Sequence, residues 1–383
     1  MPQDPIQPAN NASSQVPGAP ASNRSKSSTT SLLGVLGIIC LFLIIALYVS
    51  WPKIRPILVP QELSVSTQEG AYAKAVEVTQ SVLSDPNASV EQKALAVSSY
   101  VGARYRVSGN VNDLLLDIQD LKQIVLNPVV TAKTRADSLA WLAGMYNNFG
   151  RNPMLFTETF KGDPFASYLV EGNPDLSARR LFEWSYSINP SSYAAINIAW
   201  WYAAQAGFNP KLDTATRDSN TSLAAEYLRL ADTLSNQETI NNPNFVNNAR
   251  YQTFRSYRSL VVDALALQNV EPYNTTYRDE FNAYVTFAQS GNHILSTGLL
   301  LNARLVHAGV LLRDKDTTGV TEQLDLIAEG MKDVQNPAVS NFVLMLGNER
   351  KSGSTTGRSG IIAEMYQYSP AFKAAVEAAV AAN

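Results

Sequence analysis

Hydrophobic and polar positions along most of this chain follow the period of an α-helix. From about residue 66 onward, apolar residues recur three and four positions apart, and few runs alternate with the period of two that a strand requires. Asn, Gly and Pro punctuate these segments as helix stops. The pattern predicts an all-α fold with helices over residues 66–84, 90–107, 111–126, 131–149, 175–188, 191–206, 219–235, 244–268, 276–289, 292–313, 319–334, 337–348 and 360–382, the last of which Pro370 is placed to interrupt.

One stretch has no polar face at all. The run LLGVLGIICLFLIIALYV, Leu32 to Val49, contains no charged residue and no proline. A helix of this length spans the roughly 30 Å hydrocarbon core of a bilayer. Tyr48 and Trp51 lie at one end, where amphipathic rings favour the membrane interface. We therefore expect a single transmembrane helix over residues 31–51, which is not cleaved because its N-terminal flank is too long for a signal peptide.

The anchor divides the chain into parts of different composition. Residues 1–30 are rich in Pro, Asn, Gln and Ser and carry too little apolar surface to fold, so we expect a disordered tail. We expect a juxtamembrane linker over 52–63, a helical domain over 64–235, and a helical extension packed on the same solenoid over 236–383.

Charge does not orient the anchor. Arg24 and Lys26 precede the apolar run, and Lys53 and Arg55 follow it, which is a tie under the positive-inside rule. Because a single N-terminal anchor most often leaves the short tail inside, we expect a single-pass protein of the cell membrane with an extracytoplasmic C-terminal domain.

Three predicted helices share one motif, in which a small residue follows a large apolar one and an aromatic residue comes three positions later. The motif occurs as Val101-Gly102-x-x-Tyr105, Leu142-Ala143-x-x-Tyr146 and Ile198-Ala199-x-x-Tyr202, each followed by a glycine. This spacing places all three side chains on one helix face, where the small residue allows a neighbouring helix to approach. Residues 65–235 thereby resemble the tetratricopeptide repeat, with insertions near 151–174 and 208–220. Other solenoids of helical pairs fit the same pattern.

The resemblance implies a concave groove, lined by the first helix of each pair, that takes an extended peptide or a partner helix. On the matching helices the groove face would include Arg106, Asn147, Asn148, Tyr193, Trp200 and Trp201. Such residues suit a peptide groove, because a guanidinium group forms paired hydrogen bonds with a carboxylate and side-chain amides form hydrogen bonds with a peptide backbone. An ordinary solvated helix face would carry the same residues.

Four of the five tryptophans fall in one region, at positions 141, 184, 200 and 201. They are consistent with an enlarged aromatic core, or with a stacking platform for a sugar or an anchor pocket for a partner. Because neighbouring helical residues point about 100° apart, Trp200 and Trp201 cannot both enter one core face.

Composition narrows the classes of function. The net charge of −3 provides no basic field for nucleic acid. The only cysteine, Cys40, lies in the apolar run, and the chain has two histidines. This composition argues against catalysis or metal binding by cysteine or histidine side chains. His293 and His307 are too far apart on one helix to share a metal. We expect no enzymatic activity and no cofactor.

Two loops resemble ligand sites. The segment after Arg313 has the spacing of oxygen-bearing side chains that is typical of a calcium-binding loop. The candidate calcium ligands are Asp314, Asp316, Thr318, Glu322 and Asp325. An Asp/Thr/Gly turn that caps the next helix would have the same sequence. Gly353–Gly360 resembles a phosphate loop but has Arg358 in place of the lysine and follows no strand, which favours a linker.

These observations predict a membrane-anchored scaffold that binds a protein or peptide partner near the cell envelope. The alternative is a module that binds cell-wall glycan through the region of residues 141–201. An enzyme with a site in the 151–174 insertion ranks last, since nothing in the sequence positions its carboxylates, Glu158, Asp163 and Glu171.

Overall fold

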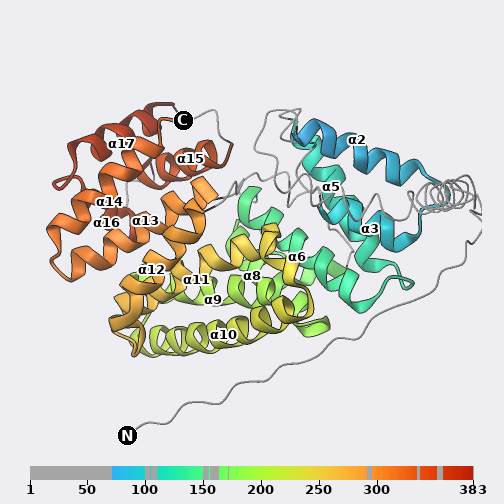
Figure 1. Cartoon of the computed structure of the whole chain (residues 1–383), viewed down its shortest axis with the longest axis horizontal. Helices are drawn as coiled ribbons and strands as arrows, with labels where there is room; N and C mark the ends of the chain where they lie inside the picture. The colour runs from blue at the N-terminus through green and yellow to red at the C-terminus, as the bar shows by residue number, and fades with distance from the viewer. Residues whose placement is uncertain are drawn as a thin grey trace, which may run out of the picture. The chain divides into compact units, whose positions relative to one another are not determined.

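The computed structural model describes residues 71–99, 104, 110–149, 155, 164–170, 172–290, 296–333, 337–351 and 357–382. In these ranges the chain forms fourteen α-helices and two 3-10 turns and contains no β-strand, which confirms the predicted all-α class (Figure 1). The described helices belong to one compact unit that spans residues 52–383.

The predicted tail, anchor and linker, residues 1–63, lie outside the described residues. Within the described ranges, no helix has both the length and the apolar character that crossing a bilayer requires. The anchor over Leu32–Val49 therefore stays a prediction.

In the N-terminal half, the helices follow the predicted segments closely. They are α2 (Ala71–Ser84), α3 (Val90–Ser99), α5 (Val111–Leu126), α6 (Ala132–Phe149), α8 (Pro174–Ile188) and α9 (Ser192–Phe208), and the 3-10 turn η1 (Pro164–Ser167) lies between α6 and α8. Asn110, Asn173 and Ser191 cap α5, α8 and α9, each accepting a hydrogen bond from a backbone N–H of the first turn. Such caps satisfy donors that have no partner inside the helix, and so they fix where each helix begins.

Two boundaries near the middle of the chain differ from the prediction. Helix α10 (Thr214–Asn241) begins well before residue 219, because the Asp213 carboxylate accepts hydrogen bonds from the backbone N–H and the hydroxyl of Thr216, at 2.8 and 2.7 Å. The helix predicted over 244–268 is divided into a 3-10 turn, η2 (Pro243–Asn247), and α11 (Ala249–Leu267). Asn248 separates them by capping α11.

The C-terminal helices are α12 (Tyr273–Gln289), α13 (Ser296–Arg313), α14 (Thr317–Gly330), α15 (Pro337–Lys351), α16 (Gly357–Met365) and α17 (Pro370–Ala382). Pro370 does interrupt the last predicted helix, since α16 ends at Met365 and α17 begins at the proline. The Ser369 hydroxyl accepts a hydrogen bond from the Phe372 N–H at 3.0 Å, and proline is favoured in the first turn that follows such a cap.

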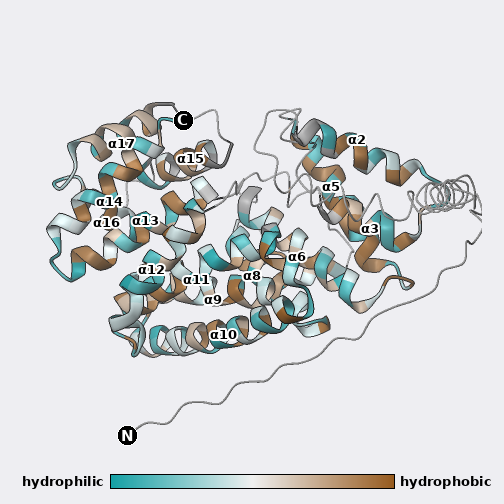
Figure 2. Ribbon diagram, viewed as in Figure 1, coloured by the Kyte–Doolittle hydropathy of each residue, from teal (hydrophilic) through white to brown (hydrophobic). Residues whose placement is uncertain are grey.

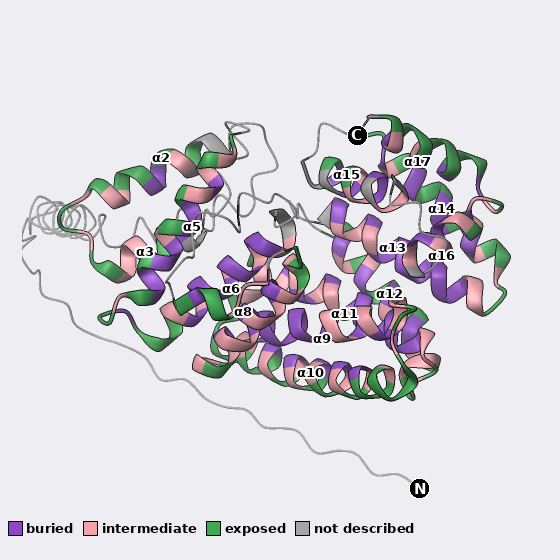
Figure 3. Ribbon diagram, turned by 180° about the vertical axis from the view of Figure 1, so that it is seen from behind, coloured by how far each residue is buried: buried purple, intermediate pink, exposed green. Residues whose placement is uncertain are grey.

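Three helices form the centre of the packing. Helix α9 contacts α8, α10, α11 and α16, helix α11 contacts α12 and α13, and α13 contacts α14 and α15. Every residue of Ser192–Ala199, Ser259–Ala266 and Ala303–Leu311 is buried, as the purple segments of α9, α11 and α13 show (Figure 3). By contrast, α10 carries one buried stripe, and hydrophilic and hydrophobic residues alternate along it (Figure 2). The helices thus stack in pairs, an arrangement consistent with a helical-repeat fold.

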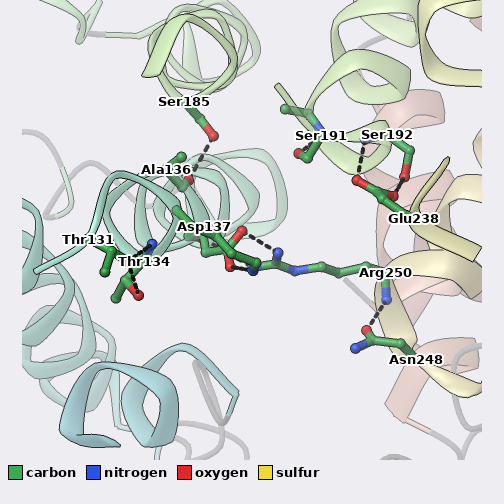
Figure 4. A network of polar contacts seen from close by, with 12 residues as sticks. Thr131, Thr134, Ala136, Asp137, Ser185, Ser191, Ser192, Glu238, Asn248 and Arg250 are labelled. Carbon is green, nitrogen blue, oxygen red and sulfur yellow. Dashed lines mark hydrogen bonds and ion pairs between the residues drawn. The ribbon is translucent and has the colours of Figure 1, made fainter. Parts of the chain in front are cut away.

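Polar side chains fix the ends of neighbouring helices (Figure 4). Glu238, near the end of α10, accepts hydrogen bonds from the backbone N–H of Ser192 at 3.0 Å and from the Ser192 hydroxyl, at the start of α9. The Ser185 hydroxyl on α8 donates to the Ala136 carbonyl oxygen on α6 at 2.7 Å. Because both contacts need close, directional geometry, they set the register within each helix pair.

Arg250 joins α11 to α6 and α9. Its guanidinium donates to the Asp137 carboxylate at 2.5 Å and lies over the rings of Trp141 and Tyr193, with 5.3 and 5.7 Å to the ring centroids. Burial by itself raises the pKa of Asp137, but attraction to Arg250 and Lys133 outweighs it, and the pKa lies below its ordinary value. The ion pair is therefore charged in the native state at neutral pH.

We expect Arg250→Gln to lower the free energy of unfolding by about 2 kcal/mol, because Asp137 then keeps, among the described residues, only the exposed Lys133 as an ion-pair partner. The pKa of Asp137 is depressed on folding, so the stability from the pair is present above the ordinary value of 3.8 and is lost as pH falls through the lowered folded pKa. Urea unfolding over a pH series checks this, with Lys133→Gln as the control that costs about 0.5 kcal/mol or less. A difference that does not shrink in acid would show that Arg250 acts through ring stacking alone.

Candidate functional site

An accessible aromatic surface lies where α8, α9 and α10 meet. Its members are all partly exposed, and they are Arg179, Glu183 and Tyr186 on α8, Trp201 and Tyr202 on α9, and Tyr227 on α10. The three residues of α8 are four and three positions apart, so they share one helix face. These six side chains form the aromatic–arginine surface.

Arg179 occupies one half of this surface. Its Nη1 donates to Glu183 at 2.5 Å and to the Tyr202 hydroxyl at 2.9 Å. The guanidinium carbon lies 4.6 Å from the centroid of the Trp201 ring and 5.5 Å from that of Tyr202. Cation–π contacts of this kind contribute about 0.5–2 kcal/mol, depending on exposure. A paired guanidinium thus rests on two aromatic rings.

Tyrosines form the other half. The rings of Tyr202 and Tyr227 are nearly parallel, with centroids 6.2 Å and planes 13° apart, and Tyr186 meets Tyr227 edge-on at 5.8 Å. Burial raises the pKa of all three hydroxyls, and the nearby carboxylates of Glu183 and Glu226 raise it further. The hydroxyls are therefore protonated at neutral pH and can donate hydrogen bonds.

Two donors on this surface are unsatisfied. Trp201 Nε1 and Arg179 Nε are shielded from solvent, yet neither has a hydrogen-bond partner among the residues that the structure describes. Shielded polar groups without a partner are uncommon in native proteins and carry a desolvation cost. An acceptor that reaches either group would remove part of this cost.

The structure distributes the predicted groove residues over different environments. Tyr193 is 7% exposed and packs between Trp141 and Phe182. Trp200 points inward to Phe208 and Tyr257, whose hydroxyl also accepts a hydrogen bond from Asn147 at 3.5 Å. Because α9 is covered on every side from Ser192 to Ala199, it does not line an open groove there.

Trp201 is the predicted groove residue that reaches the aromatic–arginine surface. Trp200 and Trp201 point to different neighbours, as helical geometry predicts. Arg106 and the side chain of Asn148 lie outside the described residues.

The remaining tryptophans serve other contacts. Trp184 stacks on Tyr168 at 4.4 Å, with ring planes 8° apart, and also contacts Phe165. Both partners belong to the predicted 151–174 insertion, whose described part therefore docks on α8. Arg250 covers Trp141. The four tryptophans thus make four separate contacts rather than one platform.

The predicted calcium ligands have other partners. Asp314 accepts a hydrogen bond from the Tyr277 hydroxyl at 2.6 Å, and Asp325 accepts one from Ser369 at 2.6 Å. Asp316 caps α14 through the Gly319 N–H and pairs with Arg278, while Thr318 and Glu322 are exposed. No group of three His, Cys, Asp or Glu side chains in the described ranges could hold a metal ion. The presence of Asp316 at this position is explained by its role as the N-cap of α14.

The other candidate sites offer little chemistry. Arg358, from the phosphate-loop-like segment, donates to Asn302 at 2.6 Å. It also borders an apolar recess between α9, α13 and α16 that admits little more than a water molecule. His293, Glu158, Asp163 and Glu171 lie outside the described residues.

Sequence reasoning missed a buried pair. His307 Nδ1 lies 3.1 Å from Asp263 Oδ1, both side chains are buried, and Phe281 stacks on the imidazole at 3.8 Å. Asp263 Oδ2 has no partner within the described part of the chain. Burial raises the pKa of Asp263, and His307 opposes this without cancelling it. The available signal was a charged or polar residue inside an apolar run, as in Leu260–Leu267 and Leu299–Leu312.

We expect Asp263→Asn to gain stability relative to the wild type as pH rises from the acid range toward neutral. A carboxyl whose pKa is raised on folding loses its favourable contribution as pH rises from 3.8 through the raised value, and the amide has no such loss while still accepting the hydrogen bond. Thermal unfolding of both proteins across that range measures the difference. The opposite slope would mean that Asp263 and His307 form a charged pair in the native state.

Comparisons with models of protein families, with curated proteins and with solved structures find no match for this chain. Its function is therefore inferred from the arrangement of its own side chains.

Proposed function

We propose that this chain is a scaffold that binds a protein or peptide partner on the aromatic–arginine surface. One observation carries the proposal: Trp201, Tyr202, Tyr227 and Arg179 are gathered in one place and are partly exposed. Tryptophan, tyrosine and arginine are the residues that most often supply the binding energy of protein interfaces. Tryptophan and tyrosine combine a large apolar area with a hydrogen-bond donor at a small cost in side-chain entropy, and arginine adds a planar set of donors.

The surface is rigidly supported, which favours binding. Tyr186, Tyr202 and Tyr227 pack against both large apolar clusters of the core, one around α5, α6 and α8 and the other around α9, α11 and α13. Glu238 further holds α10 to α9. A side chain that is already ordered loses little freedom when a partner binds, so more of the contact energy appears as affinity.

The proposal also includes three predictions from the sequence that the described residues do not test. The helical pairs would be tetratricopeptide-like, residues 32–49 would anchor the chain in the cell membrane, and the helical domain would face the extracytoplasmic side. The scaffold would then hold its partner close to the bilayer.

Site-specific photo-cross-linking in cells tests this. A photoreactive residue at position 227 should cross-link to a discrete partner, and Trp201→Ala or Arg179→Gln should reduce that product several-fold while the protein still melts cooperatively. A reactive residue in place of Ile240, which is 79% exposed on the same helix, is the matched control and should not capture the partner. The proposal would be contradicted if positions 227 and 240 captured the partner equally well. It would also be contradicted if neither Trp201→Ala nor Arg179→Gln changed the amount of cross-linked product.

Glycan binding, the other predicted function, has less support from the geometry. A sugar platform uses an open aromatic face, and Arg179 covers a face of Trp201 while Tyr168 covers one of Trp184. Retention on cell-wall polysaccharide that Trp201→Ala abolishes would favour it over a protein partner.

A further inference from the structure

The two halves of the aromatic–arginine surface differ in one respect. Around Arg179, in the first half, lie the rings of Trp201 and Tyr202 and the carboxylate of Glu183. In the second half Tyr227 meets Tyr202 and Tyr186, and Glu226, which is not one of the six side chains, borders the surface from α10. Among the residues that the structure describes, a cation lies over the rings in the first half alone: Arg179 pairs with Glu183 and lies over Trp201 and Tyr202. The first half shows what kind of group this surface holds.

The second half has the same components without the cation. Tyr186 and Tyr227 present partly exposed rings in edge-to-face contact, and Glu226, next to Tyr227 on α10, is exposed. Glu226 makes no ion pair with any residue that the structure describes. It nevertheless lies close enough to both tyrosines to act electrostatically on their hydroxyls.

Among the charged side chains Arg179, Glu183 and Glu226, the carboxylates outnumber the cation. Arg179 pairs with Glu183, at 2.5 Å, and Glu226 makes no ion pair in the described part of the chain. The faces of aromatic rings are themselves negative because of the ring quadrupole, so rings and carboxylate attract the same type of group. A guanidinium or ammonium can contact a tyrosine face and a carboxylate together, as Arg179 does.

We propose that Tyr186, Tyr227 and Glu226 receive a lysine or arginine side chain from a basic segment of the partner. This inference rests on the proposed function, because it names the chemistry of the partner at the same surface. An acidic segment would be repelled by Glu226, and a neutral, proline-rich segment would use the rings but not the carboxylate.

Fluorescence anisotropy with labelled peptides and the full chain in neutral detergent micelles tests this chemistry. The probes are an arginine- and lysine-bearing peptide, the same peptide with citrulline and acetyl-lysine, an acidic peptide and a neutral proline-rich one. We expect the basic peptide to bind most tightly, and its affinity to fall with added salt. Citrulline and acetyl-lysine keep the length of the side chains and remove the charge, so they isolate the charge itself.

Glu226→Gln should weaken binding of the basic peptide about fivefold, from the loss of one partly exposed charge pair. Tyr186→Leu, which removes a ring but not a charge, should weaken it to a similar extent. Asp218→Asn makes the same chemical change at an exposed position of α10, away from the tyrosines, and should leave the affinity unchanged.

The two proposals fail in different ways. If the neutral or acidic peptides bind as well as the basic one, if the basic one does not bind, or if Glu226→Gln has no more effect than Asp218→Asn, the inference about a basic partner is wrong. Cross-linking from position 227 that still depends on Trp201 would then leave the scaffold proposal standing. Loss of that cross-link as well would overturn both.

Discussion

Helix α9 must be covered on every side, and the rest of the structure is arranged to meet that constraint. From Ser192 to Ala199 it has no polar face, and all of these residues are buried by α8, α10 and α11 and by contacts from α6. Burying one large apolar side chain contributes about 1.5–3 kcal/mol, so leaving any face of this helix in water would be costly. The consequence for function is direct. Side chains of α9 become partly accessible only from Trp200 onward, and Trp201 and Tyr202 lie where α8 and α10 also contribute aromatic residues.

Apolar burial draws these helices together but does not by itself choose their register. That choice is made by directional contacts between residues far apart in the sequence, such as Arg250 with Asp137 and Glu238 with Ser192. Removing one partner of such a contact leaves the other with an unpaired polar group, so an alternative packing is penalised. Asp263 and His307 fit the same account, since each would be an unpaired polar group in the interior without the other.

The position of most helices could be predicted, because their limits are local. Asn110 and the Asn127-Pro128 stop bound α5, and they act on backbone groups within a turn of themselves. The start of α10 was harder, since Thr214–Asn220 has little apolar periodicity and the helix is held there by the Asp213 cap. The candidate site was only partly predictable. Trp201 was expected to lie at a binding surface, whereas Tyr193 lies in the core, because α6 and α11 cover the face that the repeat resemblance left open.

The sequence by itself determined the all-helical class, most helix limits and the division of Trp200 and Trp201 between two directions. Periodicity, caps and the angle between adjacent residues are properties of short segments, and they need no knowledge of distant neighbours. Only the tertiary structure decided which face of each helix stays accessible, that Arg179 lies on Trp201, and that Asp263 meets His307. These contacts join different helices, so they depend on how the helices pack. The spacing of residues along one helix carries no information about that packing.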